Sequence, residues 1–414
     1  MIRRIDTVVI GAGQAGLAMS RCLTERGVEH VVLERGRVAD RWRNETWDSL
    51  RLLSPNWMSR LPGWSYTGPD PHGYMTAAEV VSYLQGYADA SAAPVQEESA
   101  VEHVGLDGER FEIITSDQNW RAGNVVVATG WCDRPTVPAM AHQLDTELTQ
   151  VVPAAYRRPA DLPEGGVLVV GASATGAQLA DELAAAGRDV VLAVGSHSRL
   201  PRKYRGMDIF WWLERIGTFD RTIDEALDPV AARQEPSLQL VGRPDHCTID
   251  LDTLRVRGVE LAGRMTAADG QHVHFAGDLA PTIAAADGRL DRILADIDVH
   301  IEASCLGEEV LDRERTRPIP VDHQLLDLDL RDRRVRTVIW ATGYRRAYPW
   351  LHVPVLDEAG EIRQRHGVTP VPGLYVLGQR FQHRRNSNFI DGVGRDAIEV
   401  AEHVIHHTCS IGRA

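Results

Sequence analysis

The hydrophobic pattern of the chain consists of short apolar runs, each followed by a glycine-rich turn or an amphipathic stretch. The first run, residues 6–10 (DTVVI), leads directly into residues 11–16 (GAGQAG). Helical periodicity follows and stops at Gly27, a residue type that suits the end of a helix. A second apolar run at residues 30–33 then ends in Glu34. This order of strand, helix and strand predicts a βαβ unit.

The same pattern recurs later in the chain. Residues 167–170 (VLVV) form an apolar run that precedes residues 171–176 (GASATG). A helical stretch continues to about Ala186, Gly187 is its predicted cap, and residues 189–193 (DVVLA) are apolar again. Two βαβ units of this kind predict an α/β fold with two Rossmann-like dinucleotide-binding domains.

Further periodic segments complete the predicted fold. Thr76 and Glu79 have the spacing of a capping box, and the apolar positions after them predict a helix. Residues 206–330 show no simple pattern, although they contain the pair Trp211-Trp212. Because neighbouring helical residues point in different directions, we expect one tryptophan in the core and the other at a substrate entrance or a homodimer contact. The remaining predicted elements are strands at 111–115, 124–128, 335–341 and 374–377, and a helix from 394 to about 407.

Composition and charge narrow the class of protein. The chain has 414 residues, 43% of them hydrophobic and 25% charged, which is ordinary for a globular protein of two or three domains. Its net charge of −13 argues against general affinity for nucleic acid. No apolar run approaches the ~20 residues of a membrane span, and the N-terminus does not resemble a signal peptide. We expect a soluble, cytoplasmic protein. Lys203 is the only lysine among 45 basic residues, which indicates a G/C-rich bacterial genome.

The cysteines and histidines disfavour two further kinds of site. The five cysteines are far apart in the sequence and form no CxxC pair, so a disulfide reductase with a local redox dithiol is disfavoured. The 16 histidines show no spacing typical of metal ligands, and no metal site is predicted.

The first glycine motif has the features of a dinucleotide site. Gly11 permits a tight turn, Gly13 lets the backbone approach a pyrophosphate, and Gly16 allows close packing of helix on strand. The N-terminus of the helix offers N–H groups to phosphates, and Glu34 can accept hydrogen bonds from a ribose diol. The alternative is a glycine-rich turn in an unrelated α/β fold. The predicted site also includes the flanking residues Gln14, Ala15 and Arg35.

The second motif retains Gly171 and Gly176 but has Ser173 in place of the middle glycine, with Thr175 at the start of the helix. No acid stands at the end of its second strand. Instead the chain continues with Ser196, Arg199, Arg202 and Lys203. A ribose 2′-phosphate repels a carboxylate and binds cations, so this half is predicted to bind NADPH, with Arg199 as the first choice for the phosphate. The alternative is a solvated basic face in an arginine-rich chain.

The motifs in this order resemble those of the flavin-containing monooxygenases, in particular the bacterial and YUCCA-like branch of the class B flavoprotein monooxygenases. The resemblance covers nearly the whole chain and is carried by residues 11–16 (GAGQAG), 41–43 (RWR), 47–52 (WDSLRL), 128–130 (ATG), 171–176 (GASATG) and 341–344 (ATGY). It implies the glutathione reductase type of fold, with an NADP(H) domain inserted into an FAD domain. The implied limits are 1–157 and 335–414 for the FAD domain and 158–334 for the NADP(H) domain with a substrate-region insertion.

The resemblance also implies further cofactor-binding residues. Trp42 and the segment around Leu52 line the flavin, and Asn56 is the one polar residue expected to act catalytically beside it. Residues 373–378 and 386–394 resemble the segment that closes over the isoalloxazine. The other implied cofactor-binding residues are Thr129, Gly130, Thr342, Gly343 and Gly378.

The activity implied is that of an NADPH-dependent FAD monooxygenase. Reduced flavin would add O2, and the resulting C4a-hydroperoxyflavin would transfer one oxygen atom to a small substrate with a nucleophilic nitrogen, sulfur or activated carbon. Many members carry a histidine segment before the second glycine loop, whereas residues 152–157 here read VPAAYR. The Baeyer–Villiger fingerprint, which centres on such a histidine, is therefore not met.

Three hypotheses of function remain open at this point. The first is the monooxygenase. The second is an NADPH oxidase or quinone-type reductase with the same cofactors and no oxygen transfer, and the third is a non-enzymatic flavoprotein that senses NADPH. The tryptophans Trp42, Trp47, Trp57 and Trp64 are candidates for an apolar wall over the flavin, or for an ordinary core cluster.

Overall fold

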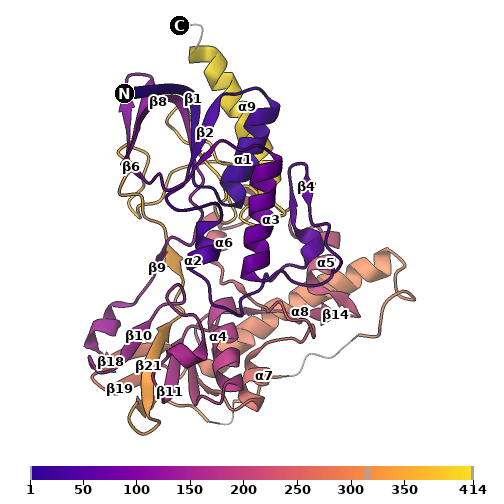
Figure 1. The fold of residues 1–414 in the computed structure, drawn as a ribbon. Helices are drawn as coiled ribbons and strands as arrows, with labels where there is room; N and C mark the ends of the chain where they lie inside the picture. Colours follow the sequence, from indigo (N-terminus) through magenta and orange to yellow (C-terminus); the bar gives the residue numbers. More distant parts are fainter. Residues whose placement is uncertain (1, 314–317, 322, 412–414) are drawn as a thin grey trace.

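The computed structural model describes residues 2–313, 318–321 and 323–411, which form two α/β lobes, one above the other in Figure 1. The prediction of a doubled α/β fold is confirmed, because each lobe is built on a sheet whose parallel strands carry one glycine motif, although β6 and β7 join the first sheet antiparallel. Within the described residues, no helix has the length and apolar character needed to cross a bilayer.

The first lobe contains a seven-stranded sheet in the order β5-β2-β1-β8-β7-β6, with β23 paired to the C-terminal half of β8. Its strands are β1 (Ile2–Ile10), β2 (His30–Leu33), β5 (Val95–Gln96), β6 (Val101–Asp107), β7 (Arg110–Thr115), β8 (Asn119–Val127) and β23 (Leu374–Val376). Apolar side chains of β1, β2 and β8 alternate between the two faces, so each face has its own buried cluster.

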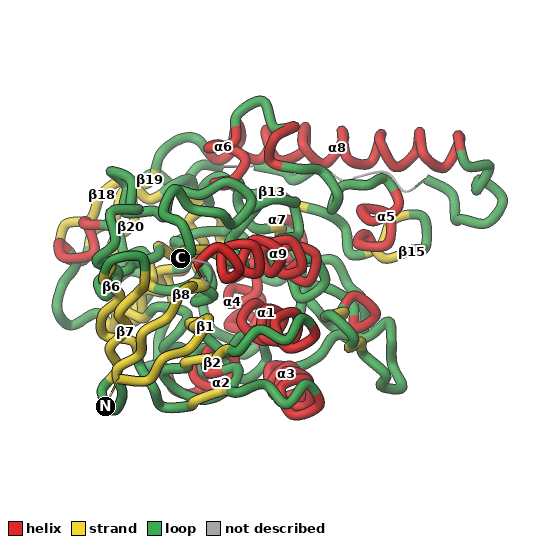
Figure 2. The backbone as a smooth tube through the Cα atoms, turned by 90° about the horizontal axis from the view of Figure 1, so that it is seen from above, coloured by secondary structure: helices red, strands yellow, loops and turns green. Residues whose placement is uncertain are grey.

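Three helices cover one face of this sheet: α1 (Gln14–Glu25), α3 (Ala77–Ala90) and α9 (Val393–Ile411). Figure 2 shows α1, α3 and α9 side by side, seen nearly end-on. The predicted capping box is present at the start of α3, where Thr76 accepts a hydrogen bond from the Glu79 backbone and Glu79 accepts one from the Thr76 backbone. Gly27, with φ +69°, follows the C-cap of α1 as predicted.

The second lobe contains a five-stranded parallel sheet in the order β10-β21-β11-β12-β17. Its strands are β10 (Thr149–Val151), β11 (Gly166–Val170), β12 (Val190–Ala193), β17 (Glu260–Ala262) and β21 (Val335–Trp340). Helices α4 (Ala174–Ala185) and α7 (Leu251–Val256) cover one face. A small antiparallel sheet of β18 (Met265–Asp269), β19 (His272–Phe275) and β20 (Asp327–Asp329) covers the other.

The strand pairing moves the domain limits predicted from the sequence. Residues 149–151 and 335–340 were assigned to the FAD domain, but β10 and β21 pair within the sheet of the second lobe. The crossings between lobes lie instead at β9 (Arg134–Pro135) and β22 (Tyr344–Arg345), which pair with each other antiparallel. The Thr136 N–H also donates to the Gly343 carbonyl at 2.8 Å. The pattern of apolar residues could not distinguish which of two similar sheets each of these two strands joins.

Residues 198–240 and 279–311 contribute a further body against the second lobe. It contains β13 (Ser198–Arg199), β14 (Lys203–Tyr204), β15 (Met207–Asp208), β16 (Leu238–Gln239) and the helices α5 (Ile209–Arg215), α6 (Pro229–Gln234) and α8 (Leu279–Ala303). Trp212 is fully buried here, and its indole N–H donates a hydrogen bond to the Tyr204 carbonyl. Trp211 is only partly buried. The prediction that one tryptophan of this pair lies in the core is therefore confirmed. Helix α8 extends beyond the rest of the molecule (Figure 2). The short elements α2 (Asp40–Asn44), β3 (Arg60–Leu61) and β4 (Trp64–Ser65) belong to the first lobe.

Candidate functional site

The first glycine loop, between β1 and α1, is shaped as a phosphate cradle. Gly11 has φ +105°, and a Cβ there would lie 2.7 Å from the Ala128 carbonyl oxygen. A Cβ on Gly16 would lie 1.8 Å from the Gly11 carbonyl oxygen, so both positions exclude a side chain. A Cβ on Gly13 would meet nothing within 4 Å, and Gly13 is the N-cap of α1 with no side-chain cap. Open space therefore faces the N–H groups at the start of α1, which fits a dinucleotide phosphate.

Glu34, at the end of β2, is buried and faces this loop. Its carboxylate accepts a hydrogen bond from the Ala12 N–H at 2.7 Å and another from the Gly36 N–H at 3.0 Å. These two bonds fix the orientation of the carboxylate, which retains further acceptor capacity for a ribose diol. Arg35 points elsewhere, because its guanidinium pairs with Glu45 at 2.9 Å on the surface.

The second glycine loop, between β11 and α4, has the same backbone geometry. Gly171 also has φ +105°, and a Cβ there would lie 2.4 Å from the Ala341 carbonyl oxygen. A Cβ on Gly176 would lie 1.7 Å from the Gly171 carbonyl oxygen. Ser173 is the N-cap of α4 and makes no side-chain cap hydrogen bond. The start of α4 can thus bind a second dinucleotide phosphate in the way that α1 binds the first.

Two of the cations predicted for the NADPH 2′-phosphate are held inside the protein, which corrects that assignment. Arg199 is buried and pairs with Asp250 at 3.2 Å and with Asp287 at 2.7 Å. Arg202 is fully buried and donates to Asp208 at 2.5 Å and to the Leu53 carbonyl at 2.7 Å. Arg202 also lies over the rings of Tyr74 and Phe210. Asp250 and Asp287 stand far from Arg199 in the sequence, so the linear pattern could not reveal those two pairs, whereas Asp208 lies six residues after Arg202.

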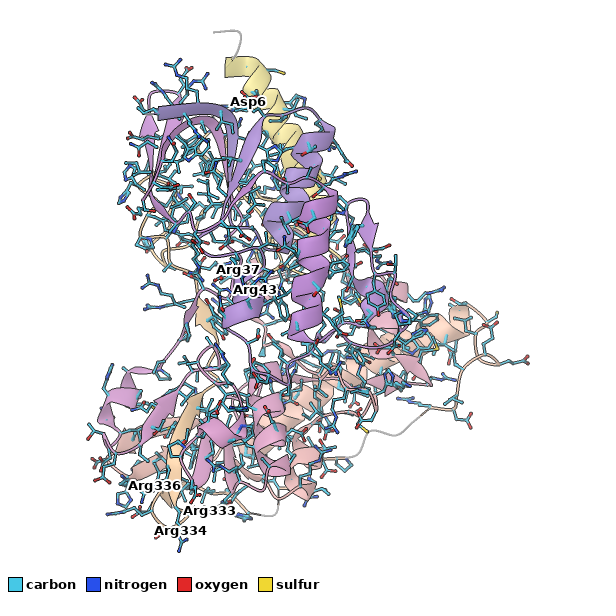
Figure 3. All side chains as sticks on the ribbon, viewed as in Figure 1. Asp6, Arg37, Arg43, Arg333, Arg334 and Arg336 are labelled. Atoms are coloured by element: carbon cyan, nitrogen blue, oxygen red, sulfur yellow. The ribbon has the colours of Figure 1, made fainter. Side chains whose placement is uncertain are left out.

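Of the remaining candidates near the second loop, Ser196 lines the central cavity, and Lys203 is exposed but lies outside that lining. Another arginine-rich turn does not serve this site. Arg333, Arg334 and Arg336 gather at the foot of the second lobe (Figure 3), at the N-terminal end of β21. The glycine loop leaves the opposite, C-terminal end of the parallel strands.

Asn56, the predicted catalytic residue, is engaged within its own loop region. Its side-chain NH2 donates to the Asp70 carbonyl at 2.9 Å, and its side-chain oxygen accepts from the Met75 N–H at 2.7 Å. The side chain is buried and is not among the residues that line the central cavity. Asn56 therefore holds residues 70–75 through both polar groups of its side chain, and its catalytic role stays a prediction.

A cavity of about 1310 Å³ lies between the two lobes and is lined by residues of both glycine loops. Its volume exceeds the ~300–1,000 Å³ that is typical of a pocket for one small molecule. The predicted site residues that line it are Gln14, Trp42, Leu52, Gly171, Ser173, Thr175, Ser196, Thr342 and Gly343. Thr129 packs behind Gly11, and Gly378, with φ +79°, packs against Ala15.

The four-tryptophan cluster divides into two pairs. Trp42 and Trp47 line the cavity, so they can shield a bound cofactor from water. Trp64 instead packs against Tyr83 and Tyr87, and Trp57 lies under the guanidinium of Arg60.

Several cavity residues were not predicted from the sequence, among them Trp131, Arg233, Arg380 and Phe389. Two of them follow motifs that were recognised. Trp131 comes directly after residues 128–130 (ATG), and Arg380 lies two residues after Gly378. Extending those motifs by a few residues would have found both.

A cluster of potential ligand groups forms at the start of α9, where His383, Asp396 and Glu399 lie together. Arg384 donates to Asp396 at 2.9 Å and to Glu399 at 2.5 Å, and His383 contacts Glu399 at 2.8 Å. The carboxylates thus already have a resident cation, which fits an internal ion-pair network.

Comparisons with known proteins show what the sequence and the fold of this chain are similar to. A family model described as pyridine nucleotide-disulphide oxidoreductase matches residues 8–210. A CzcO-like oxidoreductase of Geobacillus kaustophilus is 33% identical over 406 residues, which cover 97% of this chain and 99% of the relative. The indole-3-pyruvate monooxygenase YUCCA1 of Oryza sativa subsp. japonica is 26% identical over 420 residues, covering 96% of this chain and 90% of the relative.

Among solved structures, a flavin-containing monooxygenase from Stenotrophomonas maltophilia superposes with a TM-score of 0.67 at 22% identity, covering 98% of this chain and 99% of that chain. The fold is therefore that of the flavoprotein oxidoreductases with two dinucleotide-binding domains. With its full-length similarity to the relative from Geobacillus kaustophilus, the chain belongs to the CzcO-like oxidoreductases, and its fold is that of the flavin-containing monooxygenases.

Proposed function

We propose that this protein is an NADPH-dependent FAD monooxygenase that transfers one oxygen atom from O2 to a small substrate with a nucleophilic nitrogen, sulfur or activated carbon. The observation that carries the proposal is the meeting of both glycine loops at one cavity. Gln14 comes from the first loop and Ser173 and Thr175 from the second, and all three line the same space. A flavin and a nicotinamide bound by these loops can therefore approach each other.

Each loop has a distinct part in this proposal. The N–H groups at the start of α1 bind the FAD pyrophosphate in the space that Gly13 leaves open, and Glu34 binds the adenosine ribose. The N–H groups at the start of α4, where Ser173 is the N-cap residue, bind the NADPH pyrophosphate. When bound, FAD supplies the redox chemistry, since it accepts a hydride and reacts with O2.

The chain itself supplies position and a dry environment. Trp42 and Trp47 are large apolar side chains in the wall of the cavity, where they exclude water from the cofactors. Exclusion of water favours transfer of oxygen to the substrate over release of peroxide. Similarity to the monooxygenase YUCCA1 over nearly the whole chain supports this assignment.

Dithiol chemistry is disfavoured by the state of the cysteines. All five lie within the described residues and are free thiols. Cys132 lines the cavity, and burial raises its pKa to about 11, so it stays protonated near neutral pH and is a poor nucleophile.

The test is an isotope and stoichiometry experiment on the purified flavoprotein. NADPH, ¹⁸O2 and the probe thioether thioanisole are supplied, and NADPH, sulfoxide and peroxide are quantified. A monooxygenase converts NADPH, H⁺, O2 and thioether into NADP⁺, water and a sulfoxide that carries one ¹⁸O atom. An amine and an aldehyde probe extend the test to nitrogen and activated carbon.

The competing hypotheses predict different balances. An oxidase converts NADPH, H⁺ and O2 into NADP⁺ and one equivalent of peroxide with every probe. A quinone-type reductase consumes NADPH only when a quinone is added, and a sensor shows negligible turnover with all acceptors. Any of these three results, with no ¹⁸O in product from any probe, would overturn the proposal.

A further inference from the structure

Four arginines gather on the cavity wall that is formed by α6 and the segment after β23. Arg233 stands in the last turn of α6, Arg346 follows β22, and Arg380 and Arg385 follow β23. Two acids accompany them. Arg346 pairs with Glu361 at 2.5 Å, and Arg385 pairs with Glu235. These six side chains carry four positive and two negative charges, and Arg345, Arg363 and Asp357 also line the cavity.

Arg380 is the first of the two arginines with no acidic partner. It is partly buried, and its guanidinium lies 5.3 Å from the centre of the Trp131 ring. No carboxylate within the described residues lies in ion-pair distance of it. Burial lowers its pKa, and the neighbouring charge of Arg385 lowers it further. The negative charge of Glu235 acts to raise the pKa of Arg380, but Glu235 is already paired with Arg385.

Arg233 has a similar environment. Its Nε donates a long hydrogen bond of 3.4 Å to the Phe381 carbonyl, and within the described residues it forms no ion pair. Burial and then the charge of Arg346 lower its pKa. The negative charge of Asp224 acts to raise the pKa of Arg233, but Asp224 contacts Arg365 and His366 instead.

A guanidinium that loses hydration without gaining an anion is unfavourable, and proteins normally pair such charges. Here two of them line the same wall of a cavity that is built to receive ligands. Each offers a planar fork of N–H donors that matches a carboxylate or a phosphate. The excess positive charge on this wall would be balanced by an anionic ligand.

We propose that Arg233 and Arg380 form a binding site for an anionic group of a small molecule held in the cavity. The chemistry required is that of a carboxylate or a phosphate. Two sources fit this chemistry: a carboxylate on the oxygenated substrate, and a phosphate of the dinucleotides. The substrate source rests on the proposed function and would narrow its substrate class to carboxylates. The dinucleotide source would supply the phosphate contact that the buried Arg199 and Arg202 do not.

The test measures binding without turnover, so it is independent of whether the protein oxygenates anything. Full-length Arg233→Gln and Arg380→Gln variants are compared with wild type. Arg264→Gln serves as the control, because Arg264 is exposed in the second lobe and lies outside the cavity lining. It changes the net charge by the same amount. Flavin content and melting temperature are measured for every variant.

Two matched pairs of probes are titrated by calorimetry into the flavin-loaded protein. Phenylacetate is compared with its neutral amide phenylacetamide in the presence of saturating NADP⁺, and NADP⁺ is compared with NAD⁺. Loss of a charge-assisted hydrogen bond should weaken binding of the anionic probe on the order of 10- to 100-fold. The neutral or less charged partner should be unaffected.

The pattern of losses identifies the source. Weaker phenylacetate binding with intact NADP⁺ binding assigns the site to the substrate. A smaller preference for NADP⁺ over NAD⁺, or loss of flavin at an unchanged melting temperature, assigns it to a nucleotide phosphate. The proposal is overturned if both variants bind all four probes and flavin like the control. Equal loss of charged and neutral probes also overturns it, since that result indicates only a structural role.

Discussion

Replacement of Gly13 by alanine should remove FAD binding while leaving the fold nearly unchanged. Gly13 has φ −83° and ψ −171°, a conformation that alanine adopts without strain, and its Cβ would meet nothing within 4 Å. Alanine is a poorer N-cap than glycine by about 1 kcal/mol, whereas loss of glycine stabilises by about 0.4–1 kcal/mol through the unfolded chain. The two effects offset each other, so the melting temperature of the apoprotein should shift by only a few degrees.

The effect on the cofactor should be much larger. The new methyl group would occupy the space in front of the α1 N-terminus, where the pyrophosphate is proposed to lie. Loss of two charge-assisted bonds at about 1.5–3 kcal/mol each corresponds to at least a 100-fold weaker Kd for FAD. Flavin fluorescence titration of the apoprotein measures this Kd, and circular dichroism measures the melting temperature.

A matched substitution at the other end of α1 should behave in the opposite way. Gly27 has φ +69° with nothing near its Cβ, so Gly27→Ala should lower stability by about 1 kcal/mol and leave FAD affinity unchanged. If Gly13→Ala binds FAD as tightly as wild type, the pyrophosphate does not lie at this loop and the reasoning is refuted.

Three further predictions concern single side chains. Glu34→Gln should weaken FAD binding on the order of tenfold, because an amide accepts only one of the two backbone N–H bonds now made; flavin content after dialysis measures the loss. Thr76→Ala should destabilise the protein by about 1 kcal/mol through loss of the α3 capping box, and unchanged urea denaturation would contradict this. Burial lowers the pKa of His197 below its ordinary 6.5, so the unfolded state takes up a proton first and stability falls as the pH drops below about 6.5. His197→Gln should reduce this slope by up to about 1.4 kcal/mol per pH unit in denaturation curves between pH 7.5 and 5.5, and equal slopes would exclude the mechanism.

Local features of the fold were predictable from the sequence because their causes are local. Both βαβ units, the α3 capping box and the glycines after α1 and α4 depend on residues a few positions apart. The doubled architecture followed from the repeat of these units. Strand order did not follow, since β10 and β21 could satisfy their apolar pattern in either sheet, and only the tertiary structure places them in the second.

The parts of the candidate site that backbone geometry forms were predictable from the sequence. The parts that depend on ion pairs formed on folding were not. Arg199 looks like a phosphate ligand in the sequence, but folding brings the distant Asp250 and Asp287 to it, whereas Arg202 pairs with Asp208, which is only six residues away. Conversely, nothing in the sequence distinguishes Arg233 from other arginines of an arginine-rich chain, and Arg380 is marked only by its place two residues after Gly378. What distinguishes these two arginines is that neither pairs with an acid within the described part of the chain. This can be seen only in the three-dimensional structure.

The pairing of β9 with β22 bears on how such a chain could have arisen. The second lobe leaves and rejoins the first through two strands that lie side by side, with Pro135 opposite Tyr344. A module whose two ends are adjacent can be inserted into a surface loop of another protein without disturbing its host. Gly11 and Gly171 share a φ of +105°, so host and insert carry glycine loops of the same backbone geometry. An insertion whose ends meet in this way leaves both sheets intact and creates a cavity at the seam between them.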